Sequence, residues 1–396
     1  MISRNIPILG LCQIIHVSGT STFVLLGGII GSEIAPTPAW ATLPVTFSVA
    51  GNALGTIPAA LLMRRIGRRL GFAAAAAASV VASLLAVLAV AEGNFALFCL
   101  AAVMIGLNGA FVQQYRFAAS ESVDSAQSAR AVSFVLVGGI VAGFLGPEVA
   151  RRTRDLLPAI PYAGSFLSLA VLYFIATLLL LTFFRNTRIQ AQTVQGVERP
   201  LRVISGQPLF RLAVFSAAVG YGVMSFIMTA TPLHLTGHAG FSIDEAAMVV
   251  QSHIIAMYLP SLFTGWLMER LGMTRVLLLG VFAMLICVTI AMISIHLMHF
   301  WLALVLLGVG WNFLFVGGTV LLTRTYLPAE RFKAQATNDF VVFASQALSS
   351  ASAGTILHLA GWPALGVTSL LPLLITLFAI ISLRRQITLA PAAASA

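Results

Sequence analysis

Twelve apolar runs of about 20 residues follow one another along the chain, and the short segments between them hold almost all of its charge. Charged residues make up only 9% of the 396 positions, whereas a soluble domain carries about 25%. So little charge cannot cover a water-facing surface, which excludes a soluble enzyme or a disordered scaffold. A segment in lipid must satisfy its own backbone hydrogen bonds, so runs of this length are predicted to be helices. We predict an all-α membrane protein with twelve transmembrane helices.

The spans divide into two sets of six. The longest connection, residues 185–210, is predicted to be a cytoplasmic linker between an N-terminal bundle at 1–184 and a C-terminal bundle at 211–396. The twelve predicted spans are residues 8–31, 41–63, 72–91, 95–115, 130–150, 165–184, 211–232, 245–268, 276–295, 300–323, 338–359 and 363–383.

The basic residues predict the orientation. Of the 22 Lys and Arg residues, all but Arg151, Arg152 and Arg154 fall on the side of the N-terminus. Lys and Arg accumulate in the short loops on the cytoplasmic side of a membrane, so both termini are predicted to be cytoplasmic in a cell (inner) membrane. The net charge of +10 is therefore an orientation signal, and we expect no nucleic-acid partner.

Two motifs recur at nearly one offset. The pattern G-x-N-x-x-F-V occurs at 106–112 and again at 310–316, while Leu-Met-x-Arg-x-Gly occurs at 62–67 and 267–272. Duplication of a six-helix unit explains both matches. Parallel repeats of this kind occur in secondary transporters, whose substrate site lies at the repeat interface near the bilayer midplane.

Strong polarity follows a period of three spans. The third, sixth, ninth and twelfth spans contain no Asn, Gln, His, Asp, Glu, Lys or Arg, and are predicted to face lipid. Polar groups in the other spans are predicted to point inward, because a polar group facing lipid is costly.

These features resemble the major facilitator superfamily over essentially the whole chain. The segment Gly265-x-x-x-Glu269-Arg270-x-Gly272 is similar to the family's loop signature G-x-x-x-D-R-x-G-R-R, whereas the first copy has Arg64 at the acidic position. The resemblance implies two pseudo-symmetric six-helix bundles that work by alternating access. It also implies gating roles for the motif residues Arg65, Gly67, Glu269, Arg270 and Gly272.

Candidate substrate-binding residues are amides, rings and one imidazole within the inward-facing spans: Gln13, His16, Asn108, Tyr115, Tyr221, Gln251, Tyr258, Trp311, Asn312 and Gln346. Asn108 and Tyr115 share a predicted helix face, and so do Gln251 and Tyr258. The alternative for Asn108 and Asn312 is hydrogen bonding between helices, worth roughly 0.6–2 kcal/mol.

Proton coupling has two candidates. His16 could carry a proton or be a satisfied core residue. Asp339 lies in the first turn of its predicted span, where a carboxylate complements the helix dipole, and this structural interpretation is favoured over proton coupling.

No motif of an ATPase or hydrolase is present. The single lysine, Lys333, follows Phe332 and precedes Ala334, so no Gly-Lys-Ser/Thr phosphate loop exists. The three cysteines lie inside apolar spans, and neither a metal site nor a cofactor is expected. The chain is therefore predicted not to be an enzyme, and its driving force must be a substrate or ion gradient.

The leading hypothesis is a secondary active or facilitative transporter of a neutral, planar, hydrogen-bonding solute such as a vitamin- or flavin-like compound. Uncharged amides and rings suit such a solute better than an ion. The alternatives are a drug/proton antiporter, whose span-four arginine this chain lacks, and a membrane-embedded receptor or enzyme. The expected partners are the solute, the bilayer and, if transport is coupled, protons; the expected state is a monomer.

Reporter fusions test the orientation. Fusions after Arg69, Ile189 and Arg385 are expected to report cytoplasmic positions, and fusions near Pro36 and Thr236 external ones, because the basic loops stay inside. Paired phosphatase and fluorescent-protein fusions measure this, and one reversed pair overturns the span assignment.

Overall fold

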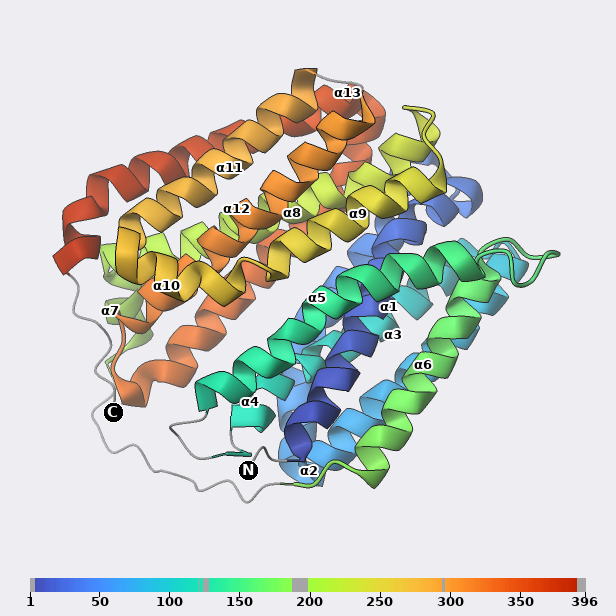
Figure 1. Ribbon diagram of the computed structural model, residues 1–396, viewed down its shortest axis with the longest axis horizontal. Helices are drawn as coiled ribbons and strands as arrows, with labels where there is room; N and C mark the ends of the chain where they lie inside the picture. Colours follow the sequence, from blue (N-terminus) through green and yellow to red (C-terminus); the bar gives the residue numbers. More distant parts are fainter. Residues whose placement is uncertain (1–3, 121, 124–127, 187–198, 294–295, 390–396) are drawn as a thin grey trace. The chain divides into compact units, whose positions relative to one another are not determined.

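The computed structural model describes residues 4–120, 122–123, 128–186, 199–293 and 296–389, and the regular structure in these ranges is helical (Figure 1). The long helices are α1 (Asn5–Ile34), α2 (Leu43–Ala91), α3 (Phe95–Val112), α5 (Ser128–Thr153), α6 (Ala163–Thr182), α8 (Pro208–Gly237), α9 (Ile243–Tyr258), α10 (Ser261–Leu271), α11 (Met273–Ile293), α12 (Leu297–Thr323) and α13 (Arg331–Leu389). The short ones are η1 (Pro38–Trp40), α4 (Tyr115–Ser120), α7 (Leu201–Gly206) and η3 (Pro328–Glu330).

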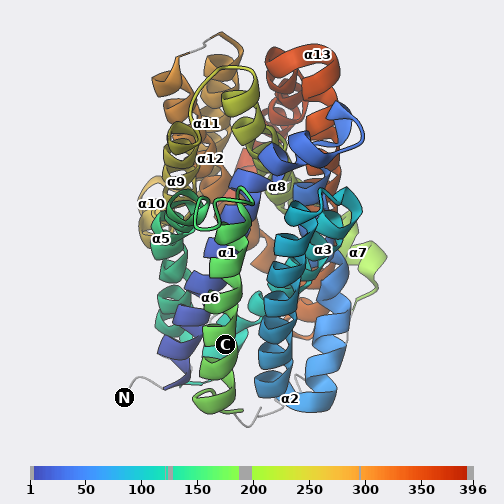
Figure 2. The same ribbon diagram turned by 90° about the vertical axis from the view of Figure 1, so that its right-hand side faces the viewer.

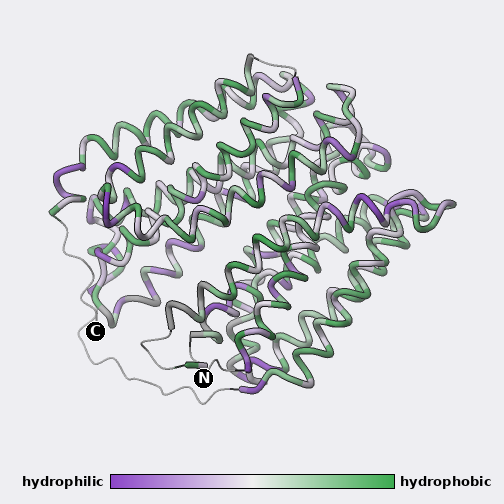
Figure 3. Tube along the Cα trace, viewed as in Figure 1, coloured by the Kyte–Doolittle hydropathy of each residue, from purple (hydrophilic) through white to green (hydrophobic). Residues whose placement is uncertain are grey.

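The helices match the predicted spans. Within the described residues, nine helices are long and apolar enough to cross a membrane, and ten if the bent pair α9 and α10 forms one span. The nine already count α2 as two spans. Dividing α13 at Gly361 and adding the 26-residue α5 then gives twelve helices, one at each predicted span. Hydrophilic residues gather at helix ends and connections, while the helix middles are largely hydrophobic (Figure 3).

The repeated loop motif forms the same backbone turn in both copies. Gly67 has φ 81° and ψ 161°, and Gly272 has φ 86° and ψ 149°. This region of backbone space is open essentially to glycine alone. Each glycine therefore reverses the chain between two spans with no intervening loop, which explains why the glycine recurs at the same motif position.

The chain forms two compact units that do not coincide with the predicted halves. Unit 1 comprises Met1–Ile189, Met228–Ile255 and Ser350–Leu359, and unit 2 comprises Gln190–Ile227, Ala256–Ser349 and Ala360–Ala396. In unit 1, α2 packs against α3 and α6, and α1 against α5; in unit 2, α11 packs against α12. The division into two sequential bundles stays a prediction.

One end of unit 1 gathers segments predicted to be cytoplasmic. The Asn5 side chain donates to the Arg185 carbonyl at 2.9 Å and to Ser122 Oγ at 3.0 Å, and accepts from the Arg185 backbone N–H. Asn186 Oδ1 accepts from the Arg69 backbone N–H at 2.8 Å, beside the turn at Gly67. The start of α1, the α4–α5 connection, the Gly67 turn and the end of α6 thus lie together, as one membrane side requires.

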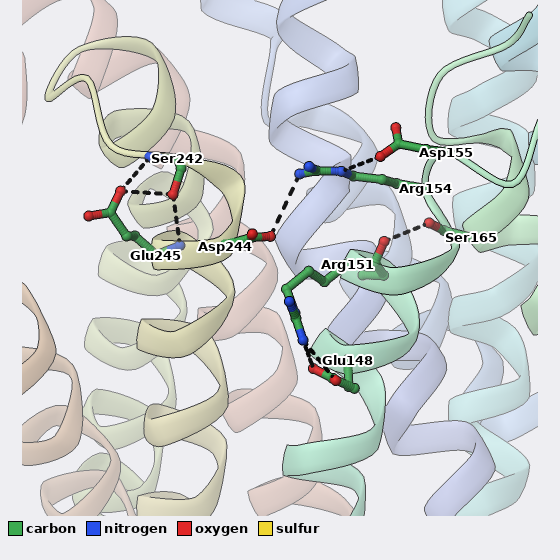
Figure 4. A network of polar contacts seen from close by, with 9 residues as sticks. Glu148, Arg151, Arg154, Asp155, Ser165, Ser242, Asp244 and Glu245 are labelled. Atoms are coloured by element: carbon green, nitrogen blue, oxygen red, sulfur yellow. Dashed lines mark hydrogen bonds and ion pairs between the residues drawn. The ribbon is translucent and has the colours of Figure 1, made fainter. Parts of the chain in front are cut away.

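The opposite end of unit 1 carries a second polar network (Figure 4). Ser242 and Glu245 form a capping box at the start of α9, with Ser242 N–H donating to the Glu245 carboxylate at 2.7 Å. Arg154, after α5, lies 3.8 Å from Asp244 and 3.0 Å from Asp155. These partly exposed pairs contribute little stability but connect the end of α5 with the start of α9.

Hydroxyl groups join helices of the two sequence halves inside unit 1. Ser350 Oγ on α13 lies 3.1 Å from Thr46 Oγ1 on α2 and 3.0 Å from Thr229 Oγ1 on α8. These three side chains are buried. Their mutual hydrogen bonds explain how short stretches of α8 and α13 pack into a unit otherwise made from the first half.

A buried carboxylate fixes the end of the linker in unit 2. Glu330 is fully buried and accepts from Arg199 Nε and Nη2, each at 2.7 Å, and from the backbone N–H groups of Arg199 and Leu327. The Arg199 guanidinium and these hydrogen bonds lower the pKa of Glu330 to about 2. Its carboxylate is therefore charged at physiological pH, and the pair ties residue 199 to the α12–α13 connection.

Candidate functional site

Helices α1, α2 and α3, labelled in Figure 2, pack against one another in unit 1. Each contributes one residue to a polar trio, which consists of His16 on α1, Asn52 on α2 and Asn108 on α3. Asn108 Nδ2 lies 3.4 Å from His16 Nδ1. A Cβ atom built on Gly109 would lie 3.0 Å from Asn52 Oδ1 and 3.4 Å from His16 Nε2. Glycine at 109 therefore lets Asn52 and His16 pack closely against α3, beside Asn108.

Two acceptors of the polar trio lack a partner. Asn52 Oδ1 and Asn108 Oδ1 are buried atoms without a hydrogen bond to any described residue. His16 is 7% exposed and Asn108 is 3% exposed, so bulk water does not compensate them freely. An unsatisfied buried acceptor costs about 1–3 kcal/mol and calls for an explanation. A bound solute with hydrogen-bond donors would supply the missing partners.

Asn312, the repeat equivalent of Asn108, is saturated. It is fully buried, its Nδ2 donates to the Met257 carbonyl and to Ser261 Oγ, and its Oδ1 accepts from Thr264 Oγ1 at 2.7 Å. Pro260, which lacks an N–H group, separates α9 from α10 at a 47° bend, so carbonyls at the end of α9 need other donors. These bonds favour the interhelical alternative for Asn312, and substrate contact there stays a prediction.

An aromatic cluster occupies unit 2 and consists of Tyr221, Tyr258, Trp311, Phe315 and Phe343. Trp311 stacks on Phe315 with ring centroids 5.2 Å apart, and Tyr221 meets both rings edge-on. Trp311 is buried and its indole Nε1 has no hydrogen-bond partner among the described residues, whereas the other four rings are half-buried. The cluster offers ring surface and one unused donor.

Comparison with known proteins decides the family. Residues 9–250 and 213–394 match the sequence profile of the Major Facilitator Superfamily. The chain belongs to this superfamily. It is therefore a multi-pass membrane transporter of a small-molecule substrate.

Two bacterial relatives cover nearly the whole chain. The protein named riboflavin transporter RfnT, from Brucella anthropi, is 40% identical over 360 residues, which are 91% of this chain and 90% of that protein. YddS of Bacillus subtilis, an uncharacterized MFS-type transporter, is 27% identical over 383 residues, covering 92% and 87% of the two chains.

Solved structures share the fold. A bacterial homolog of the human lysosomal transporter Spinster, in an inward-facing and occupied conformation, has a TM-score of 0.72 at 15% identity and covers 98% of both chains. The nucleoside transporter NupG also has a TM-score of 0.72, at 14% identity, covering 95% of this chain and 99% of that one. The major facilitator fold predicted from the sequence is confirmed.

The predicted gating residues of this superfamily member surround the two Gly turns. Arg65 and Glu269 are exposed, and the Arg270 guanidinium lies over the Trp266 ring, 4.8 Å from its centroid. Gly67 and Gly272 make the turns themselves. The structure explains the two glycines, while the gating roles stay predictions.

Tyr115 is not part of the polar trio. The predicted face shared with Asn108 is wrong, because α3 ends at Val112, two turn residues intervene and Tyr115 begins α4. Its ring is 2% exposed and meets Phe72 edge-on at 4.7 Å. Tyr115 therefore packs in the core of unit 1.

Asp339 is not at a helix start. The first-turn position predicted for it is wrong, because α13 begins at Arg331, eight residues earlier, and the dipole acts only within the first turn. Asp339 is half-buried and accepts from Asn338 Nδ2 at 3.1 Å.

Three further candidates are half-buried amides, Gln13 on α1, Gln251 on α9 and Gln346 on α13, whose binding roles stay predictions.

Asn52 and Phe343 were missed by the sequence prediction of the site. The sequence does distinguish Asn52. An offset of 205 pairs it with Met257, so a polar residue in the first repeat corresponds to an apolar residue in the second. The sequence does not distinguish Phe343, since one phenylalanine among 26 in an apolar chain does not stand out.

Substitution of the two repeat asparagines separates their roles. Asn312→Ala is expected to lower the free energy of unfolding by about 1–3 kcal/mol, because it leaves the Met257 carbonyl and Thr264 hydroxyl without their partner. Asn108→Ala, the matched control, is expected to cost less, since it removes a single contact of 3.4 Å. Thermal unfolding in detergent measures both, and an equal loss contradicts the assignment.

Proposed function

We propose that this protein carries a neutral, planar, hydrogen-bonding solute of the riboflavin type across the bilayer by alternating access. The observation that carries the proposal is the aromatic cluster, whose stacked and edge-on rings suit a flat conjugated ring system. The 40% identity to a protein named riboflavin transporter, over nine-tenths of both chains, supports it independently.

The chemistry of the two sites supports an uncharged solute. Neither the aromatic cluster nor the polar trio contains a carboxylate, an ammonium or a guanidinium group. Burying an ion beside such side chains would be expensive, because no opposite charge compensates it there. Ring faces with a few polar groups instead match a flavin, which has a large apolar surface and several donors and acceptors.

The proposed orientation places both termini in the cytoplasm of a cell with an inner membrane. It rests on the distribution of Arg and Lys. It is also supported by the end of unit 1 where Asn5, Ser122 and Arg185 meet, since these segments were all predicted on one side. Reporter fusions after Arg69, Ile189 and Arg385 and near Pro36 and Thr236 test this orientation.

Proton coupling through His16 or Asp339 remains part of the proposal rather than a separate function. A drug/proton antiporter is not favoured, because the cluster and the trio offer a cationic drug no carboxylate. Riboflavin uptake measured with and without an imposed pH gradient decides the coupling: an unchanged initial rate excludes it.

Counterflow in proteoliposomes tests the function without assuming a direction or a driving ion. Vesicles loaded with unlabelled riboflavin should accumulate labelled riboflavin transiently and saturably. Trp311→Leu is expected to raise the half-saturating concentration about 2- to 12-fold, because stacking contributes about 0.5–1.5 kcal/mol beyond burial.

Trp362→Leu is the matched control. Trp362 is also a buried tryptophan of unit 2, but it packs on Phe300, outside the aromatic cluster. It should leave the half-saturating concentration unchanged once the amount of folded protein is matched. No counterflow by the wild type, or equal effects of the two substitutions, contradicts the proposal.

A further inference from the structure

The polar trio has hydrogen-bonding capacity that the fold does not use. We infer that Asn108, supported by His16 and Asn52, recognises the imide edge of the transported ring, an N–H group between two carbonyl groups. The inference rests on the proposed function and specifies which edge of a flavin-like ring the first half of the transporter binds.

The unused groups are acceptors next to available donors. Asn108 Oδ1 and Asn52 Oδ1 are buried without a partner in the described residues, while Asn108 Nδ2 lies 3.4 Å from His16 Nδ1. A carboxamide nitrogen has two hydrogens. If one is directed to His16, the second remains available alongside Oδ1. Asn108 therefore presents one donor and one acceptor together.

Comparison of the repeats shows why Asn108 is unsatisfied whereas Asn312 is not. Thr264 donates to Asn312 Oδ1, and an offset of 205 places Ala59 at the matching position of the first half. Ala59 is buried and has no hydroxyl. The first repeat thus lacks the donor that completes the amide in the second.

A second replacement adds polarity at the same place. Met257, whose carbonyl accepts from Asn312 Nδ2, corresponds to Asn52 in the first repeat. Asn52 therefore introduces a carboxamide where the second repeat has an apolar side chain. With one hydroxyl donor fewer and one carboxamide more than the second repeat, the first repeat has two acceptor oxygens that a ligand can use.

An imide edge complements this arrangement. Its N–H group can donate to Asn108 Oδ1 while an adjacent carbonyl accepts from Asn108 Nδ2, the two-point pairing that a carboxamide makes with such rings. Gly109 lets Asn52 and His16 pack closely against α3 beside Asn108, because a Cβ there would crowd Asn52 Oδ1 at 3.0 Å. Asn52 Oδ1 then accepts from a second donor of the solute, such as a hydroxyl.

A pair of ligands differing by one methyl group tests the inference. Lumiflavin carries the free imide, and 3-methyllumiflavin lacks its N–H donor. Binding of each to purified protein is measured by flavin fluorescence, which does not depend on transport. The wild type is expected to prefer lumiflavin by about fivefold or more, the fold-change that corresponds to one unsatisfied buried acceptor.

Two variants are expected to abolish the preference. Asn108→Leu removes the amide, and Ala59→Thr supplies a hydroxyl where Thr264 stands in the other repeat. Both should bring the ratio of the two affinities within about twofold of unity, with thermal unfolding confirming that each variant is folded. Asn312→Leu is the matched control: it lowers stability and should leave the ratio unchanged in the protein that remains folded.

The outcomes separate this inference from the proposed function. Equal binding of the two ligands by the wild type, or a preference that survives both Asn108→Leu and Ala59→Thr, overturns imide recognition while riboflavin counterflow can still stand. Absence of any flavin binding overturns both. Uridine, which carries the same edge on a smaller ring, is expected to bind more weakly than lumiflavin; tighter binding overturns the flavin assignment.

Discussion

In a bilayer, each buried polar group must find a partner inside the protein or in a ligand, and this constraint governs the structure at every level. It makes the long apolar runs helical, since a helix satisfies its backbone within one segment. It also accounts for Asn312, whose amide replaces helical partners where Pro260 breaks a span. By the same requirement, the side-chain oxygens of Asn52 and Asn108, which have no hydrogen-bond partner in the described residues, are the atoms for which a ligand is proposed.

Duplication followed by divergence connects the fold with the site. Both copies keep the glycine turn, because Gly67 and Gly272 adopt a backbone conformation that side chains disfavour. The copies differ in what surrounds the repeated asparagine, with Thr264 in one and Ala59 in the other. One repeat therefore uses its amide to hold a bent span, whereas the other leaves its amide oxygen without a partner in the described residues, which is the basis for the proposed solute contact.

Most of the fold was predictable from the sequence, but much of the site was not. Span number, the repeat and the family follow from hydropathy and motif spacing, which depend on local composition. The prediction that Asn108 and Tyr115 share a helix face was wrong because a two-residue turn follows α3. The prediction that Asp339 lies in a first helical turn was wrong because α13 starts before its apolar stretch. Whether a buried amide has hydrogen-bond partners depends on residues of other helices. The sequence therefore identified Asn108 and Asn312 as candidates but could not distinguish their roles.

A structure of the protein with riboflavin bound tests the central claim most directly. The account predicts that the imide edge of the ring lies within hydrogen-bond distance of the Asn108 side chain, about 2.7–3.2 Å between heavy atoms. It also predicts that Asn312 keeps its bonds to Met257 and Thr264. A ring bound away from Asn108, or trio oxygens paired with protein groups in the complex, would contradict it.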